Sequence, residues 1–384
     1  MSDRSLRTVC TAAAVAAALV SAVPTAQAAP TPPTSSVSGL LTQMQTLYRQ
    51  AEEASEAYNA AEEQLKRRKA EEKRIAAGLT KARVALAESR EAAGRLAREQ
   101  YQGRSELSTY MQLLLARDPQ GALDQGHLMR RATDERQASV ARLARTEKQA
   151  DGLARAARKA LDEQTLLAAR QRRARDEVWN RLKDVEGLLA SLSEEQLVEL
   201  ARLERDGMAK AQRDLLATGA LSGARAPSEE GEQALRYAVG QLGKPYVWGA
   251  EGPRSYDCSG LTSQAWAHAG RAIPRTSQEQ WASLPRVPLR SLRPGDLVVY
   301  YPKATHVAMY LGDGLVVQAP RPGTRVKISP IASNPLLGAV RPDPGARALR
   351  SYRPPKLPVG AAGVGADAGA DSDEGYGSDA PPGD

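Results

Sequence analysis

Residues 40–65 read LLTQMQTLYRQAEEASEAYNAAEEQL, and this stretch decides the fold of the first half of the chain. Alternating steps of four and three residues reach apolar side chains at Leu40, Met44, Leu47 and Ala51, and most later positions of this series up to Leu114 are also apolar. An apolar seam that repeats every 3.5 residues is what a left-handed coiled coil requires. A helix over 40–114 would be roughly 110 Å long, which is more than a globular core can enclose.

The seam breaks at residues 118–121, which read DPQG. Proline cannot continue a helix and glycine permits a turn. A second apolar seam runs from Leu143 to Leu192, so the pattern predicts two long helices in an antiparallel hairpin. Ser193 and Gln196 then have the spacing of a capping box, which predicts a further helix ending near Gly219. We assign 40–218 to a helical coiled-coil region with a hinge near 118–121.

The segment before this region is typical of a secretory signal peptide. Residues 1–29 combine a basic start, an apolar stretch and an Ala-Gln-Ala site at 26–28, and residues 30–39 form a spacer. The alternative, a membrane anchor, requires about 20 strongly apolar residues, and this run is shorter and mostly alanine. We therefore expect a secreted protein, extracellular or associated with the cell wall. Cys10 leaves with the signal peptide, and Cys258 remains as a lone thiol in an oxidising compartment.

The composition excludes several classes of protein. The 384 residues include two Cys, three His and no Phe, aromatic residues make up 4%, and the net charge is +8. Two Cys cannot build a disulfide framework or a four-Cys zinc site, and we expect neither a metal nor another cofactor. The charge runs of the helices are those of solvated faces, or else a surface for anionic wall polymers or a membrane. No nucleic-acid recognition motif is present, so a nucleic-acid partner is not expected.

The amino-acid composition and the hydrophobic pattern of the sequence change after a linker at 219–228. Three of the four Trp fall between 248 and 281, and short apolar runs at 297–301, 307–311, 315–318, 326–328 and 337–340 read as strands broken by Gly and Pro. Residues 229–242 and 259–268 read as helices. We therefore predict a compact α+β domain over 229–345, followed by a disordered tail rich in Pro, Gly and Asp over 346–384.

The chemistry of this domain centres on Cys258. This residue lies where a helix should begin, and a helix N-terminus lowers the pKa of a thiol and offers N–H groups to an oxyanion. Of the three His, His127 lies in the coiled coil and His268 about ten residues beyond the nucleophile, so elimination leaves His306 as the base. Gln318 ends the next strand, where a hairpin could bring it alongside to orient the imidazole. Buried packing roles remain the alternative for each residue taken alone.

The motifs of this domain resemble the NlpC-type cysteine peptidases of bacterial cell walls. The resemblance covers about 228–345 and rests on PYVWG at 245–249, DCSGL at 257–261, PRTS at 274–277, LRPGDL at 292–297, HVAMYLG at 306–312 and QAP at 318–320. It implies a papain-like fold in which Cys258 is the nucleophile and His306 the base. It also implies hydrolysis of peptidoglycan stem peptides between γ-D-Glu and a diamino acid. The third catalytic position is often His in this family and is Gln318 here; a neutral amide can also hold the ring.

The resemblance also suggests residues near the substrate and a role for the helices. Tyr246 could donate to the oxyanion, Asp257 and Ser259 could receive the amino end of the stem, and Arg275 could pair with substrate carboxylates, with packing or a surface position as the alternative. A coiled coil before such a domain resembles cell-division wall hydrolases, whose helices are thought to cover the cleft until an FtsEX-type membrane complex moves them. A related Cys–His amidase that cuts the bond between sugar and peptide is a variant within the enzyme class. The competing hypothesis is a catalytically silent coiled-coil adaptor with a wall-binding domain.

Overall fold

The computed structural model describes residues 36–101, 111, 119–223 and 225–357. The predicted signal peptide, most of the spacer and the tail from residue 358 onward lie outside these ranges. No helix within them combines the length and the apolarity that a bilayer span needs.

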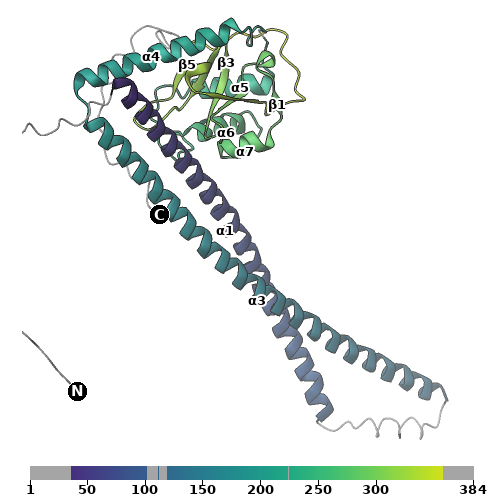
Figure 1. Ribbon diagram of the computed structural model, residues 1–384. Helices are drawn as coiled ribbons and strands as arrows, with labels where there is room; N and C mark the ends of the chain where they lie inside the picture. Colours follow the sequence, from purple (N-terminus) through teal and green to yellow (C-terminus); the bar gives the residue numbers. More distant parts are fainter. Residues whose placement is uncertain (1–35, 102–110, 112–118, 224, 358–384) are drawn as a thin grey trace, which may run out of the picture. The chain divides into compact units, whose positions relative to one another are not determined.

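Two long helices form the first part of the described chain (Figure 1). Helix α1 spans Val37–Tyr101 and α3 spans Pro119–Ala190. Gln50 accepts a hydrogen bond from Arg181, whereas Arg90 pairs with Glu147, so residue numbers fall along α3 as they rise along α1. The two helices are therefore antiparallel, which confirms the predicted hairpin.

The described residues cover only part of the predicted connection between the two helices. The described part of α1 ends at Tyr101, and seam positions Leu107, Tyr110 and Leu114, together with Asp118 of the predicted hinge, lie outside the described residues. Of the residues predicted to form the hinge, Pro119 is the first residue of α3, and Gln120 and Gly121 lie in its first turn. Proline is well tolerated there, because the first N–H groups of a helix have no partner within the helix.

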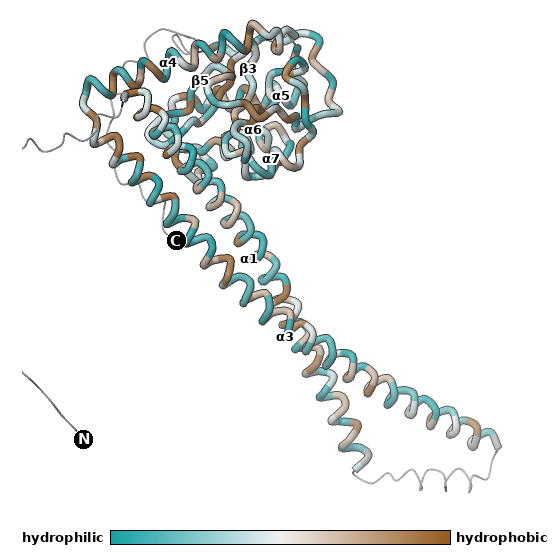
Figure 2. The backbone as a smooth tube through the Cα atoms, viewed as in Figure 1, coloured by the Kyte–Doolittle hydropathy of each residue, from teal (hydrophilic) through white to brown (hydrophobic). Residues whose placement is uncertain are grey.

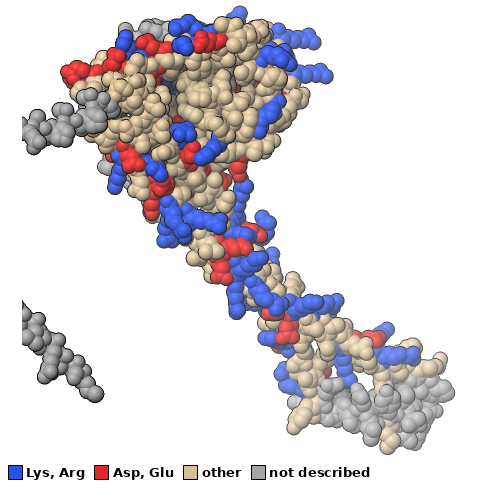
Figure 3. Space-filling model, viewed as in Figure 1, with Lys and Arg blue, Asp and Glu red and all other residues tan. Residues whose placement is uncertain are grey.

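The seam between α1 and α3 is narrow, because much of it is alanine. Ala51, Ala54 and Ala82 of α1 are buried, as are Ala160 and Val178 of α3. Apolar and polar segments alternate along both helices (Figure 2), and charged side chains of both signs cover their exposed faces (Figure 3). Each helix has only one partner over most of its length, so few of its side chains are enclosed.

A third helix, α4 (Glu194–Ala217), begins at the predicted capping box. The N–H of Gln196 donates to Ser193 Oγ, and the N–H of Ser193 donates to Gln196 Oε1 at 3.0 Å. Gln212, near the other end of α4, donates to the carbonyl of Gly314 at 2.9 Å and accepts from the N–H of Ala332 at 3.2 Å. Helix α4 thus packs on the α+β domain, although its sequence pattern resembles that of the coiled coil.

The α+β domain is built on one antiparallel sheet of six strands in the order β1-β6-β2-β3-β4-β5. The strands are β1 (Arg286–Val287), β2 (Leu297–Tyr300), β3 (His306–Gly312), β4 (Leu315–Gln318), β5 (Lys327–Pro330) and β6 (Leu336–Val340). The helices are α5 (Glu229–Val239), α6 (Cys258–His268) and α7 (Ser277–Ser283), with short 3-10 turns η1 (Leu289–Ser291) and η2 (Ile331–Ser333). The strands and helices predicted for this domain are present. Strand β1 and helix α7 were not predicted.

Both faces of this sheet are covered. In β2, Leu297 and Val299 pack on the side of Leu261 and Trp266 of α6, whereas Val298 and Tyr300 belong to the opposite face, with Leu215 of α4 packed against it. Alternate residues of a strand point to opposite faces, and all four residues of β2 are buried. The start of β3 and the start of α6 are therefore supported by a sheet that is packed on both faces.

Candidate active site

Cys258 is the first residue of α6 and is almost fully buried. Asp257 is the N-cap of this helix, and its carboxylate accepts a hydrogen bond from the N–H of Gly260 at 2.6 Å. A backbone hydrogen bond from Val307, at the start of β3, also reaches the thiol. The turn into α6 and the beginning of β3 therefore meet at the sulfur atom.

His306 immediately precedes Val307 and is fully buried. Its Nε2 lies 2.7 Å from Oε1 of Gln318, the last residue of the neighbouring strand β4. Gln318 Nε2 in turn donates to Ser333 Oγ at 3.5 Å. The structure thus places the three residues suggested by the sequence at one end of the sheet, with Nδ1 of His306 left for another partner.

The predicted substrate-side residues form one buried network. Both guanidinium NH₂ groups of Arg275 donate to the Asp257 carboxylate, at 3.0 and 2.7 Å, and one of them also donates to Ser259 Oγ at 2.9 Å. Arg275 is only 8% exposed, so the alternative of a surface arginine is wrong. Burial acts to lower the pKa of Arg275, but Asp257 and Glu251 outweigh it and the pKa is raised. Tyr246 is buried nearby, and burial followed by the proximity of Cys258 raises its pKa.

Side chains of α1 fill the space in front of these residues. Glu56 Oε1 accepts a hydrogen bond from Ser259 Oγ at 2.8 Å and lies 3.7 Å from Cys258 Sγ, and Glu56 Oε2 accepts from the N–H of Ser277 at 2.9 Å. Glu52 Oε1 lies 3.5 Å from Nδ1 of His306. Helix α1 therefore approaches both the thiol and the imidazole. Sequence analysis did not identify Glu52 or Glu56.

An aromatic contact holds α1 and α3 against the same site. The Tyr58 ring meets the Trp248 ring edge to face, with centroids 4.8 Å apart, and Trp179 of α3 meets Trp248 with centroids 6.2 Å apart. A Cβ on Gly249 would lie 3.2 Å from the Tyr58 ring, so the close approach depends on glycine. Ion pairs also join the helices to the α+β domain: Lys303–Glu53 at 3.0 Å and Lys66–Glu251 at 3.3 Å for α1, and Arg321–Glu204 at 2.8 Å for α4.

The electrostatics of the closed site correct one prediction. The helix N-terminus was expected to lower the pKa of Cys258, but burial and then the carboxylates of Glu56, Asp257 and Glu52 raise it well above its ordinary value. Burial lowers the pKa of His306 to about 4, and burial together with Asp257 raises the pKa of Glu56 to about 7. Desolvation disfavours both the thiolate and the imidazolium, and the neighbouring carboxylates further disfavour the thiolate. Covered by α1, the site favours the uncharged thiol and imidazole.

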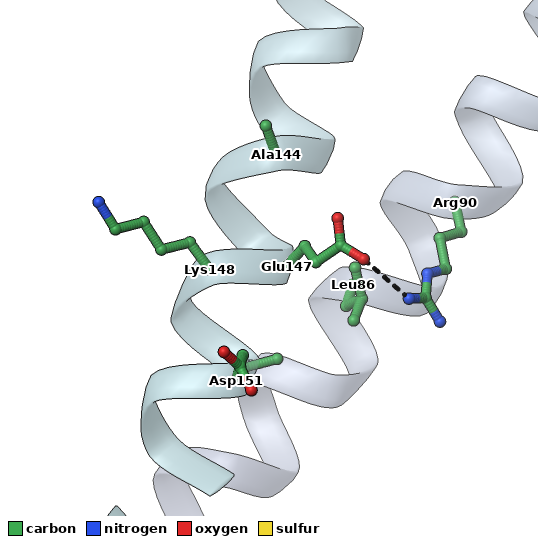
Figure 4. A pocket seen from close by; sticks show the side chains of 7 residues that line it. Leu86, Arg90, Ala144, Glu147, Lys148 and Asp151 are labelled. Carbon is green, nitrogen blue, oxygen red and sulfur yellow. Dashed lines mark hydrogen bonds and ion pairs between the residues drawn. The ribbon is translucent and has the colours of Figure 1, made fainter. Parts of the chain in front are cut away.

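No other part of the described chain offers a comparable site. The hollow in Figure 4 lies between α1 and α3 and is lined by Leu86, Arg90, Glu147, Lys148 and Asp151 among others, with no Cys, His, Ser or Thr in its lining. Within the described ranges, no cluster of three or more His, Cys, Asp or Glu residues could hold a metal ion. His268 packs against the Tyr237 ring, with centroids 4.8 Å apart. The candidate site is therefore the one around Cys258.

Comparison with known proteins agrees with this location. Residues 243–338 match the NlpC/P60 family. A 125-residue segment is 41% identical to a probable endopeptidase of Corynebacterium glutamicum (strain R), covering 30% of this chain and 59% of that protein. A 135-residue segment is 36% identical to the peptidoglycan endopeptidase RipA of Mycolicibacterium smegmatis, covering 30% of this chain and 27% of RipA. The chain thus spans less than two thirds of the length of each of these curated relatives.

The NlpC/p60 domain of the peptidoglycan hydrolase SagA is 31% identical over 29% of this chain and 97% of that chain, with a TM-score of 0.28. The family match includes Cys258, His306 and Gln318 and excludes α1, α3 and α4. The C-terminal domain of this chain belongs to the NlpC/P60 family, and a long helical region precedes it.

Proposed function

We propose that this protein is a secreted cysteine endopeptidase that hydrolyses peptidoglycan stem peptides at the bond between γ-D-Glu and the diamino acid. The observation that carries the proposal is the hydrogen bond between His306 Nε2 and Gln318 Oε1. It fixes the ring so that Nδ1 is free to exchange a proton with the thiol of Cys258. The amide oxygen of Gln318 accepts a hydrogen bond from the Nε2–H group and thereby orients the ring, which is the role of the third residue in a Cys–His site.

The proposed reaction proceeds in two steps. His306 takes the thiol proton, the sulfur of Cys258 attacks the γ-carbonyl carbon, and the proton then passes to the leaving amine of the diamino acid as the amide bond breaks. Water, deprotonated by His306, next attacks the thioester and releases the γ-carboxylic acid and the thiol. Tyr246 and the backbone N–H groups at the start of α6 are the candidates to stabilise the oxyanion in each step.

We further propose that the coiled coil regulates this reaction. The contacts of Glu52 and Glu56 cover the two reacting groups, and α1 must move before a stem peptide can reach Cys258. A membrane partner that pulls on the helices, such as an FtsEX-type complex, would provide that movement. The competing function, a silent wall-binding adaptor, draws on the same observation, since the closed site raises the pKa of the thiol.

Digestion of purified peptidoglycan, with the fragments identified by mass spectrometry, tests the proposal. The full chain and its Tyr58→Ala variant, in which the contact with Trp248 is removed, should release fragments cut after γ-D-Glu. Cys258→Ala in either background should reduce hydrolysis by ~10³-fold or more, because the nucleophile is absent. Unchanged cleavage by the Cys258→Ala chain would refute the assignment of the nucleophile. Peptidoglycan binding without cleavage in either background would favour the adaptor.

A further inference from the structure

Glu56 places next to Cys258 the same chemical group that the proposed reaction would produce. Hydrolysis of a γ-glutamyl amide releases the side-chain carboxyl of a glutamyl residue. The side chain of Glu56 ends in this same CH₂–CH₂–COO group, and its Oε1 lies 3.7 Å from Sγ of Cys258. The side chain beyond Cα is achiral, so a helical L-glutamate can present the same group as the D-glutamate of a stem peptide.

The donors around this carboxyl belong to the α+β domain. Ser259 Oγ donates to Oε1 at 2.8 Å and the backbone N–H of Ser277 donates to Oε2 at 2.9 Å. Both donors are held in place independently of α1: Arg275 donates to Ser259 Oγ, and Ser277 Oγ donates to the carbonyl of Ala304 at 2.6 Å. A preformed pair of donors beside a nucleophile is suited to a carboxyl or amide group of the substrate.

A second contact of α1 extends the correspondence. Asn59, three residues after Glu56, donates from Nδ2 to Asp257 Oδ2 at 3.0 Å. In a stem peptide, the residue before the γ-glutamyl group carries an amine or amide N–H that can donate to the same carboxylate. Helix α1 thus provides one group for the acyl position and one N–H donor for Asp257.

We propose that Ser259 and the N–H of Ser277 form the subsite for the γ-glutamyl acyl group, and that Glu56 occupies this subsite as an internal mimic of that group. This inference rests on the proposed function for the identity of the substrate. It predicts that α1 and a γ-glutamyl ligand compete for one site. It also distinguishes Glu56 from Glu53, whose carboxylate pairs with Lys303 at the rim of the contact.

Alkylation of Cys258 by iodoacetamide, followed by peptide mass spectrometry, tests the fit of Glu56 without any need for hydrolysis. In the full chain, Glu56→Ala and Glu56→Asp should each speed alkylation at least ~10-fold, because the first lacks the acyl group and the second is one methylene too short to reach both donors. Glu56→Gln should stay near the parent rate, since its amide can place its oxygen on the Ser277 N–H. The matched control Glu53→Ala should also stay near it.

Two results with these variants would overturn the subsite. One is a Glu56→Asp chain that reacts as slowly as the parent. This result would mean that protection of Cys258 requires the charge of the side chain and not its length. The other is a Glu53→Ala chain that reacts as fast as Glu56→Ala, which would reduce the effect to general loosening of α1. Circular dichroism and thermal unfolding of each variant verify that the chain remains folded.

Dipeptide probes then test the identity of the group. The peptide L-Ala-D-Glu, which carries the free side-chain carboxyl, should slow alkylation of the Glu56→Ala chain at least about threefold at concentrations above its Kd and should protect the parent chain less. L-Ala-D-norvaline, which has a methyl group in place of that carboxyl, should not protect. Equal protection by the two peptides, or none by L-Ala-D-Glu, would overturn the inference. Protection without peptidoglycan cleavage would uphold the subsite and refute the proposed function instead.

Discussion

The two halves of α1 have similar compositions but different surroundings. In the half near the α+β domain, Glu52, Ser55, Glu56 and Asn59 are all buried, at 1–6% exposure. In the far half, from residue 70 on, only Ala82 and Ser89 are buried among the described side chains. The far half has α3 as its partner, whereas the near half lies between α3 and the active site. The burial of a polar stripe therefore marks where the coiled coil has a second contact surface, against the α+β domain.

This burial is costly, which is consistent with the reversible docking that we propose. Two carboxylates are removed from water, and burial raises the pKa of both Glu52 and Glu56. Among the described residues, Glu52 Oε2, Asn59 Oδ1 and His306 Nδ1 are buried without a hydrogen-bond partner, and each such group costs about 1–3 kcal/mol. Aromatic packing against Trp248 offsets part of this cost. A contact of this kind is suited to closing a site that must open again.

The largest expected effect comes from removing the near half altogether. A fragment over 193–357 keeps α4 and the sheet but lacks α1 and α3. It should hydrolyse peptidoglycan ~5- to 150-fold faster than the full chain, the range that a coupling of 1–3 kcal/mol allows. Release of soluble muropeptides over time measures the two rates. Equal rates would mean that the near half of α1 does not inhibit the enzyme.

The starting residue of this fragment matters, and a shorter fragment serves as its control. A fragment over 228–357 lacks Leu215 and Leu221, which pack on the face of the sheet formed by Val298, Tyr300 and their neighbours. Loss of these apolar contacts should lower its free energy of unfolding by about 2–5 kcal/mol relative to 193–357. Urea denaturation followed by Trp fluorescence measures the difference. Equal stabilities would show that α4 is dispensable for the domain.

Local patterns were sufficient to predict much of the fold. Apolar runs bounded by Gly and Pro gave four of the strands nearly to the residue, and the spacing of Ser193 and Gln196 gave the start of α4. Elimination among the three His was sufficient to select His306, and the predicted pairing of two neighbouring strands was sufficient to place Gln318 beside it. These features are encoded over a few residues. The docking of α4 on the sheet was missed because its amphipathic pattern is the same whether the partner is a helix or a sheet.

The role of the near half of α1 could not be predicted for a related reason. Glu52, Ser55, Glu56 and Asn59 recur at spacings of three and four residues and form one polar face of a helix. Such a face is normally solvated, and no local feature indicates that it is buried against another domain. Only the pairing of residues about 200 positions apart, such as Glu56 with Ser259, reveals it. Burial, followed by the carboxylate of Glu56, explains why the pKa of the Cys258 thiol is raised and not lowered as the local pattern predicted.

A smaller effect is expected from pH, through Glu56. Docking raises the pKa of Glu56 from its ordinary value to about 7, so docking is favoured while Glu56 is protonated and weakens as pH rises toward 7. Cys258 alkylation in the parent chain should therefore rise with pH more steeply than in Glu56→Gln, which keeps a neutral side chain. The slope of the parent-to-Gln rate ratio between pH 4.5 and 7 measures the difference.

The ratio of the two alkylation rates is needed because other groups at the contact between α1 and the active site also titrate. His306, with its pKa lowered to about 4, favours docking as pH rises, and Glu52 acts in the same direction as Glu56. Cys258 itself reacts faster as it ionises, and Arg275 with Asp257 supplies a fixed ion pair. These groups are common to both chains, so they largely cancel in the ratio. A flat ratio would show that docking does not depend on the protonation of Glu56.

The smallest effect should come from the far half, where the same chemistry has no second partner. Arg90 and Glu147 form an ion pair at 3.3 Å beside the hollow of Figure 4, and both side chains are 61% exposed. Exposed pairs contribute about 0–1 kcal/mol, so Arg90→Ala should leave both peptidoglycan hydrolysis and Cys258 alkylation within about twofold of the parent. A large rise in alkylation with Arg90→Ala would mean that the far half transmits its state to the active site, and that the two halves of α1 are coupled along the helix.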